Sequence, residues 1–182
     1  THHGHHVWAA TGDRLIAIPS SGLHTNGYSL ARRIAFDVAR LTPESLVSEL
    51  GASIGEALLI PHRSYLRPIE ALLQSHAGVV KGMAHITGGG ITENLPRTLP
   101  DGLHAVVDRG AWEVPSIFAW LQRTGRVPVE DMFRTFNMGI GLILVCAEPD
   151  ESAVMAALAA TGEQARSIGE IRPGGSGVHY AG

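Results

Sequence analysis

A polar stretch bounded by glycines carries residue types that could bind a ligand. It reads SSGLHTNGYSL, from Ser20 to Leu30, and it gathers hydroxyl, imidazole and amide side chains ahead of a helix-like segment. Such groups, together with accessible backbone, suit a polar ligand. The same residues fit a capped turn in which Asn26 is the N-cap of the helix and Gly27 provides flexibility. The residues alone leave both interpretations open.

A second stretch, AHITGGGITENLPR from Ala84 to Arg97, contains three consecutive glycines. Glycine reaches positive φ at little cost and leaves room beside the backbone, so the triplet fits a tight turn or a cradle of NH groups for an anion. Thr92, followed by Glu93 and Asn94, is typical of a short helix start, and helix amino termini present unpaired NH groups that suit phosphate. Turn and cradle are therefore the two hypotheses.

A third stretch, FNMGIG from Phe136 to Gly141, places Asn137 and two glycines just before the most apolar segment of the chain. A ligand contact is one interpretation, and a bulge or close strand packing is the other.

Several familiar chemical signatures are absent from the sequence. There is no GxxxxGK[ST] phosphate loop, no GxGxxG, no HExxH and no paired-cysteine zinc spacing. Ser20 lacks the GxSxG frame of a nucleophile elbow and is interpreted as a turn residue. Cys146, the only cysteine, lies in the apolar run IGLILVCA and is interpreted as a buried, inert thiol. A chain that cannot form an internal disulfide fits a reducing cytoplasm.

The elements that must position these stretches alternate along the chain without repeats or long linkers. A helix is predicted over Tyr28–Leu41, because Leu30, Ile34, Val38 and Leu41 recur on one face. Prolines typical of a first helical turn occur at positions 43, 68, 115, 128 and 149, and glycines at 51, 78, 125 and 162 indicate helix ends. Strands are predicted at Asp13–Ser20, Gly82–Thr87, Leu103–Asp108, Gly139–Ala147, Ala165–Ile171 and Gly177–Tyr180.

This order, with both crossovers and possible hairpins, predicts an α+β fold: a mixed β-sheet with helices packed on its faces. The 182 residues are 45% hydrophobic and suffice for one domain, assigned to residues 12–182. Residues 1–11 begin THHGHHVW and are interpreted as a tag-like or disordered leader. A net charge of −3 with scattered arginines argues against nucleic acid, and the longest apolar run is too short for a membrane span.

Four segments, taken in order, resemble one family. SSGLHTNGYSLARR, KGMAHITGGGITENLPRTLP, FRTFNMGIG and the closing IGEI are similar to the carboxy-terminal domain of phosphoribosylformylglycinamidine cyclo-ligase, also called aminoimidazole ribonucleotide synthetase. The resemblance runs from about Gly12 to Tyr180. It implies a ligase of de novo purine biosynthesis, in which ATP activates the formyl oxygen of formylglycinamidine ribonucleotide and a nitrogen closes the ring. The alternatives are a noncatalytic ligand-binding or assembly domain of this fold, or another ATP-dependent member of the superfamily.

The resemblance also implies what this chain lacks. In the family, an amino-terminal domain supplies the acidic residues for Mg²⁺ and most of a homodimer interface, and no such segment occurs here. ATP and Mg²⁺ are thus expected to bind mainly to that partner domain, with no metal ligand in this chain. The expected location is the cytoplasm. The isolated chain is expected to fold and to be inactive.

The resemblance assigns roles to particular residues. His85 is the expected catalytic residue, as a group that orients substrate or exchanges a proton, and a buried histidine with a satisfied partner is the alternative. Arg97 is expected to pair with phosphate, with a surface arginine as the alternative. The residues expected to contact substrate or nucleotide are Ser21, Gly22, His24, Thr25, Asn26, Thr87, Gly88, Gly89, Gly90, Asn94, Arg97 and Asn137. His62 stands where the family usually has threonine, which leaves its effect open.

Overall fold

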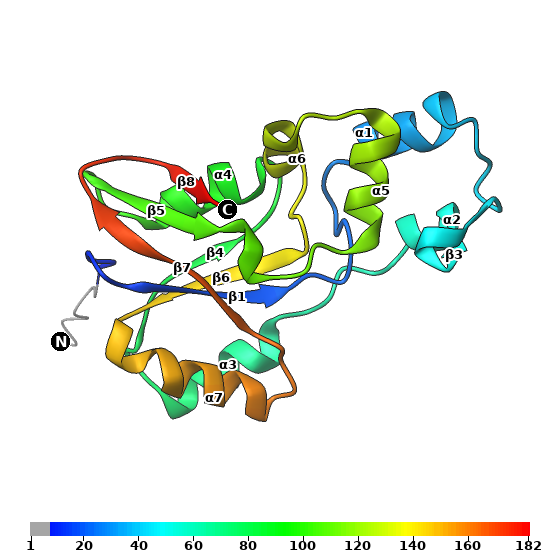
Figure 1. The fold of residues 1–182 in the computed structure, drawn as a ribbon. Coiled ribbons are helices and arrows are strands. Elements are labelled where there is room, and N and C mark those ends of the chain that lie inside the picture. The colour runs from blue at the N-terminus through cyan, green and yellow to red at the C-terminus, as the bar shows by residue number, and fades with distance from the viewer. Residues whose placement is uncertain (1–7) are drawn as a thin grey trace.

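A computed structural model describes residues 8–182 of the chain. Its main feature is a six-stranded sheet with the order β4-β6-β1-β7-β5-β8 (Figure 1). The β5–β8 pair is parallel, and the other pairs are antiparallel. The strands are β1 (Arg14–Pro19), β4 (Val80–His85), β5 (Leu103–Asp108), β6 (Ile140–Cys146), β7 (Arg166–Pro173) and β8 (Val178–Ala181). The mixed sheet and the α+β class are confirmed, and each strand lies within two residues of its predicted bounds.

Both faces of the sheet are covered, because successive side chains of its strands point to opposite sides. Ile16 and Ile18 of β1 pack with Leu72 of α3 (Leu66–Ser75) and Leu158 of α7 (Glu151–Ala160). On the other side lie α4 (Gly90–Asn94) and the 3₁₀ turn η3 (Leu95–Thr98). Figure 1 shows α3 and α7 beneath the sheet and α4 above it. Every residue of β6 is buried, including Cys146, as predicted for that thiol.

A third group of apolar residues lies beside the sheet rather than on it. It is built from helices and from Phe136 and Met138, which precede β6. The helices are α1 (Tyr28–Arg32), the π-helix η1 (Arg33–Val38), α2 (Ile54–Leu58), α5 (Ser116–Gly125) and α6 (Val129–Thr135). The remaining elements are the short hairpin of β2 (Leu46–Val47) and β3 (Ala52–Ser53) and the 3₁₀ turns η2 (Ser48–Leu50), η4 (Arg109–Ala111) and η5 (Glu148–Asp150).

The predicted helix over Tyr28–Leu41 is wrong in its second half. After Arg32 the chain winds as a π-helix, and the amide of Ala39 bonds to the carbonyl of Ile34, five residues earlier. A wider turn rotates the later side chains away from the face set by 3.6-residue spacing. Val38, predicted to be in the core, is therefore 53% exposed, whereas Ala31 and Ala35 are buried.

The proline signals are confirmed at four of five positions. Helices or a 3₁₀ turn begin around Pro68, Pro115, Pro128 and Pro149. Pro43 instead lies in a turn before β2, where its carbonyl accepts a hydrogen bond from Gly55. Of the glycine stops, Gly51 and Gly162 directly follow helical turns at positive φ, whereas Gly78 lies beyond the end of α3.

Part of the predicted leader belongs to residues that the structure describes. Ala9 is buried, and the amide of Ala10 donates to a carboxylate oxygen of Asp13 at 2.7 Å. The histidine-rich residues 1–7 lie outside the described part, so the division at residues 11 and 12 stays a prediction.

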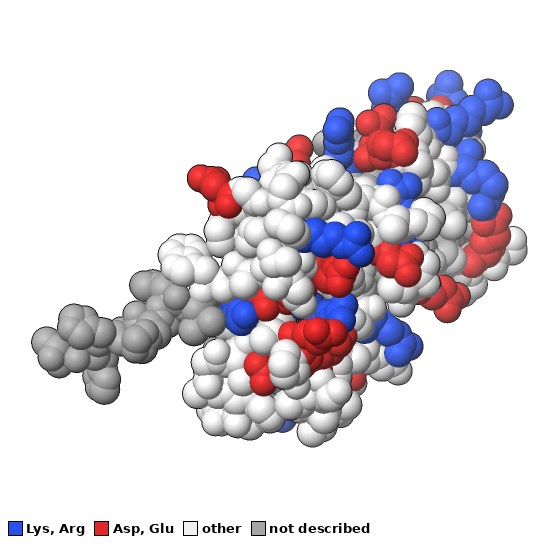
Figure 2. Space-filling view, turned by 60° about the vertical axis from the view of Figure 1, so that its left-hand side comes forward, with Lys and Arg blue, Asp and Glu red and all other residues white. Residues whose placement is uncertain are grey.

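Charged side chains of both signs are interspersed on the face shown in Figure 2. Arg14, for example, pairs with Glu148, Glu151 and Glu170. Within residues 8–182, no helix is long and apolar enough to cross a membrane.

Gly90 is expected to be required for folding. Its φ is +60°, and an added Cβ would lie 2.0 Å from the backbone oxygen of Phe133 in α6. Gly90→Ala should lower the free energy of unfolding by about 2–4 kcal/mol, from overpacking and backbone strain together. Urea unfolding measures the loss.

Gly102→Ala is the matched control, because Gly102 also has positive φ but has no atom within 4 Å of an added Cβ. It should cost only about 1 kcal/mol, from backbone strain alone. Equal losses in the two variants would contradict the close packing of α4 on α6.

Candidate functional site

The sheet brings the three polar stretches to one edge. Strands β1 and β4 both pair antiparallel with β6, so they run in the same direction and end where β6 begins. Pro19 of β1 is paired with Ile140, and His85 of β4 with Leu142. The loops that follow β1 and β4, and the turn that precedes β6, therefore meet at this edge.

The glycine loop, residues 87–90, is held in place by the buried side chain of Asn94. Asn94 donates from Nδ2 to the carbonyls of Thr87, Gly88 and Gly90, and its Oδ1 accepts from the Thr87 hydroxyl. The helix begins at Gly90 rather than at Thr92, with Gly89 as N-cap at a φ of +94°. The Asn94 side chain, which was expected to contact ligand, thus holds the conformation of the loop.

Gly88 differs from the two glycines that follow it. It is exposed, its φ is not positive, and an added Cβ would lie 3.5 Å from Oδ1 of Asn26, an ordinary contact. Within residues 8–182, the amides of Gly88 and Gly89 donate no hydrogen bond. Two free NH groups beside a carboxamide can donate hydrogen bonds to an anionic or carbonyl oxygen of a ligand.

The predicted capping role of Asn26 is wrong. The N-cap of α1 is Gly27, at a φ of +77°, and no side chain caps the helix. An added Cβ on Gly27 would lie 2.3 Å from the ring of Phe136, so glycine is needed there for packing. The Asn26 side chain instead lies beside Gly88 of the glycine loop, so the first two polar stretches meet there.

Asn137 holds the loop after β1 through side-chain hydrogen bonds. Its Nδ2 donates to the carbonyl of Gly22, and its Oδ1 accepts from the Ser20 hydroxyl and the Gly139 amide. Asn137 is 2% exposed, and both its nitrogen and its oxygen take part in these bonds. The interpretation of FNMGIG as a bulge or close strand packing fits this side chain, and the register of β1 on β6 shifts between Ile18 and Pro19, opposite Ile140.

Three imidazoles stack across the site. The rings of His24 and His62 lie 3.9 Å apart between centroids, and those of His62 and His85 lie 5.2 Å apart. The Nε2 atoms of His62 and His85 are separated by 3.3 Å. One ring nitrogen from each residue lies within 4.8 Å of the others. His24 is buried, whereas His62 and His85 are exposed.

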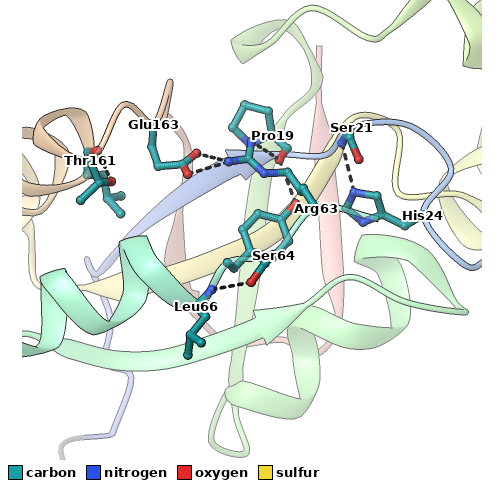
Figure 3. Close-up of polar contacts among 10 residues, drawn as sticks. Pro19, Ser21, His24, Arg63, Ser64, Leu66, Thr161 and Glu163 are labelled. Carbon is teal, nitrogen blue, oxygen red and sulfur yellow. Dashed lines mark hydrogen bonds and ion pairs between the residues drawn. The ribbon is translucent and has the colours of Figure 1, made fainter. Parts of the chain in front are cut away.

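An ion pair fixes the segment that carries His62. Figure 3 shows Arg63 between Glu163 and the carbonyl of Pro19. Its guanidinium binds both Glu163 oxygens, at 2.6 and 2.7 Å, and the Tyr65 hydroxyl donates to the same Pro19 carbonyl at 2.9 Å. Both oxygens of the nearly buried Glu163 carboxylate accept from the same nitrogen, Nη2, so the ion pair holds this end of the guanidinium in place. The residues on either side of Ser64 are thereby tied to the end of β1.

The surroundings keep His24 and His85 uncharged. Burial, and to a smaller extent charge repulsion from His62, His85 and Arg63, lowers the pKa of His24 to about 4. Burial also lowers the pKa of His85, with a further contribution from His62. The Ser21 amide donates to Nε2 of His24 at 3.0 Å, so the neutral ring carries its proton on Nδ1. Among residues 8–182, this buried Nδ1 has no hydrogen-bond partner.

The other expected ligand residues differ in their placement. Thr25 is exposed in the loop after β1, and Ser21 is half-buried with its hydroxyl bonded to the Pro61 carbonyl. Arg97 is exposed in η3, the 3₁₀ turn that directly follows α4. Sequence reasoning noticed His62 only as a departure from a pattern. No local spacing joins positions 24, 62 and 85, and only the fold shows that they meet.

This arrangement defines an α+β domain in which a candidate site for a polar ligand lies at one edge of a mixed sheet. A family model described as "AIR synthase related protein, C-terminal domain" matches residues 10–181. The chain belongs to this family. It is 47% identical over 168 residues to a phosphoribosylformylglycinamidine cyclo-ligase of Methylobacillus flagellatus, which covers 92% of this chain and 47% of the relative. A protein of the same name from Bacillus velezensis is 44% identical, over 98% of this chain and 50% of that protein.

Solved structures share the fold. Thiamine-monophosphate kinase from Stenotrophomonas maltophilia superposes with a TM-score of 0.64 at 16% identity, over 97% of this chain and 52% of that one. The hydrogenase maturation protein HypE, solved in complex with ATP, gives 0.57 at 19% identity, over 92% and 44%. The chain spans about half the length of the curated relatives it matches.

The stability of the chain is expected to depend on the protonation of His24. Between about pH 6.5 and pH 4, the unfolded chain binds a proton at His24 and the folded chain does not, so the free energy of unfolding falls as the pH is lowered. The loss through this residue should approach about 3 kcal/mol. Denaturant unfolding at pH 7 and pH 4.5, with a metal chelator present, measures it.

His24→Asn should reduce this dependence, because asparagine does not titrate and tolerates the φ of +59° found at His24. His179→Asn, at an exposed histidine of β8, should retain it. The same loss on acidification in His24→Asn as in the parent chain would rule out the buried, neutral state of His24.

Proposed function

We propose that this chain is the carboxy-terminal half of an ATP-dependent phosphoribosylformylglycinamidine cyclo-ligase. The observation that carries the proposal is the similarity of nearly the whole chain to proteins of that name, at 44–47% identity in the two relatives described above. The loops in which that resemblance is most specific are also the ones that meet at the edge of the sheet. The substrate would be formylglycinamidine ribonucleotide, and the protein would act in purine biosynthesis.

ATP would supply the phosphoryl group that activates the formyl oxygen of the substrate. Mg²⁺ would require oxygen ligands in near-octahedral geometry. Within residues 8–182, the one group of three potential metal ligands that lie together is made of histidines, which do not suit Mg²⁺. We therefore assign the magnesium ligands to an amino-terminal partner domain, in a cytoplasmic, homodimeric enzyme.

The residues of this chain would form one wall of the reaction cleft. The free amides of Gly88 and Gly89 would donate to an anionic oxygen, and the carboxamide of Asn26 lies beside them to contact the same ligand. Such preorganised donors stabilise charge that develops during group transfer without reorganising. Nearby, His85 is neutral at pH 7, so its ring can accept or donate a proton.

Asn94 and Asn137 would act as positioning residues, because the side chain of each donates a hydrogen bond to the backbone of a loop at the site. Thr25 and Arg97, both exposed, remain candidates for contacts that form only when substrate or the partner domain is present. The wall by itself cannot align the γ-phosphorus of ATP with the formyl oxygen, since alignment requires groups on both sides of the reacting atoms.

The isolated chain is accordingly expected to fold and not to catalyse. Three apolar clusters support a cooperative thermal transition. ATP-dependent ring closure should be absent from the chain alone and should appear when the amino-terminal domain of the enzyme is supplied separately. Substantial turnover by the chain alone would overturn the half-enzyme proposal. Tight ligand binding, with no turnover in either the mixture or the full-length protein, would favour a noncatalytic domain.

Gly88→Ala tests the glycine loop in the full-length enzyme. The added methyl group enters the space beside Asn26 without strain in the fold, whereas Gly89 has positive φ and an added Cβ would lie 2.5 Å from the Glu93 carboxylate. We expect kcat/KM to fall at least about tenfold, because a ligand oxygen can no longer reach the two amides, with little change in Tm. Steady-state kinetics and a thermal melt measure the two effects.

Gly82→Ala is the matched control, because Gly82 lies in β4 below the loop and its added Cβ meets only ordinary contacts, at 3.4 Å and beyond. It should leave kcat/KM unchanged. Unchanged kinetics in a folded Gly88→Ala enzyme would contradict the proposal that the loop binds ligand.

A further inference from the structure

We propose that His24, His62 and His85 bind a Zn²⁺ ion. One ring nitrogen of each residue lies within 4.8 Å of the others, and the three residues come from three different segments. They follow β1, precede α3 and end β4, respectively. Imidazole is a preferred ligand of zinc, and three histidines with one open position form a known type of zinc site.

The distance between two of the nitrogens already fits zinc. Two nitrogens that are each about 2.0–2.1 Å from a tetrahedral ion lie about 3.3 Å apart. The Nε2 atoms of His62 and His85 are separated by 3.3 Å. The distances to the third nitrogen must shorten from at most 4.8 Å to about this value. His62 and His85 are exposed, so their rings can turn without repacking the core.

The lone pair that His24 would offer to zinc is available without charging the ring. Because His24 accepts from the Ser21 amide on Nε2, its proton is on Nδ1 and its lone pair on Nε2. Zinc would compete for that lone pair with a single neutral backbone hydrogen bond, whose net contribution to stability is small because water can replace it. Ser21 is half-buried, so water can take over its amide when zinc binds.

The segment that carries His62 is held in place by contacts outside the site. Arg63 binds Glu163 and the Pro19 carbonyl (Figure 3). Tyr65 donates to that same carbonyl, so His62 adjoins a fixed backbone. A pocket of about 460 Å³, lined by His62, Tyr65 and His85 among others, borders the rings. It leaves space for the fourth zinc ligand, a water molecule or a ligand atom.

Zinc binding is tested on the full chain in a background that removes the other cluster of histidines. The leader contains histidines at positions 2, 3, 5 and 6, which bind metal by themselves, so all four are changed to serine. Calorimetric titration of this chain with Zn²⁺ should show one site per chain. Co²⁺ in the same site should give the visible absorption of a four-coordinate ion.

His62→Thr in this background should weaken Zn²⁺ binding by about 100-fold or more, since even the loss of a residue that only orients a metal ligand costs about 10- to 100-fold. His179→Thr is the matched control. His104 and His179 form another histidine pair, with ring centroids 4.4 Å apart, and the variant should bind as the background does. Thermal melts without metal confirm that each variant folds, and His85→Asn replaces His62→Thr if that variant does not.

Two results would overturn the proposal: no Zn²⁺ binding by the background chain, or the same affinity in His62→Thr as in His179→Thr. Both readouts are equilibrium binding to the isolated chain. They are therefore independent of whether the full-length enzyme catalyses ring closure.

Discussion

The burial of strand β6 on both faces is the constraint on which the rest of the structure depends. Its seven residues are all buried, so apolar layers must cover both sides of the sheet, with α3 and α7 on one face and α4 on the other. As the shared antiparallel partner of β1 and β4, this strand also makes those two strands end together. The packing of the core thus determines where the polar loops meet.

The three glycines after β4 differ in backbone conformation and in the atoms that surround them. Gly90 lets α4 approach the backbone of α6, and Gly89 takes up a left-handed conformation beside Glu93. Those two would be needed in a protein with no ligand. Gly88 has neither requirement, and its exposed amide is free within the described residues. In the function proposed for this chain, a turn and an anion cradle are therefore compatible, because Gly89 and Gly90 would form the turn and Gly88 would contact the anion.

Signals that act within a few residues predicted most of the fold. Alternating apolar residues located the strands, and proline located four helical starts, because period-two burial and a missing NH act locally. Errors arose where tertiary contacts override local preference. The π-helix exposes Val38 against its helical spacing, and Gly27, packed on Phe136, takes the cap position predicted for Asn26. At the site, the loops were predicted, but the buried bonds of Asn94 and Asn137 and the place of His62 were not.

The histidine cluster shows how one environment can support two kinds of chemistry that exclude each other. The burial that lowers the pKa of His24 and His85 keeps their rings neutral, and a neutral ring offers a lone pair to a proton or to a metal ion. In the proposed enzyme, His85 uses that lone pair for proton transfer. In the proposed zinc site, the same atom binds the ion. Zinc bound to this wall would therefore block proton transfer at His85.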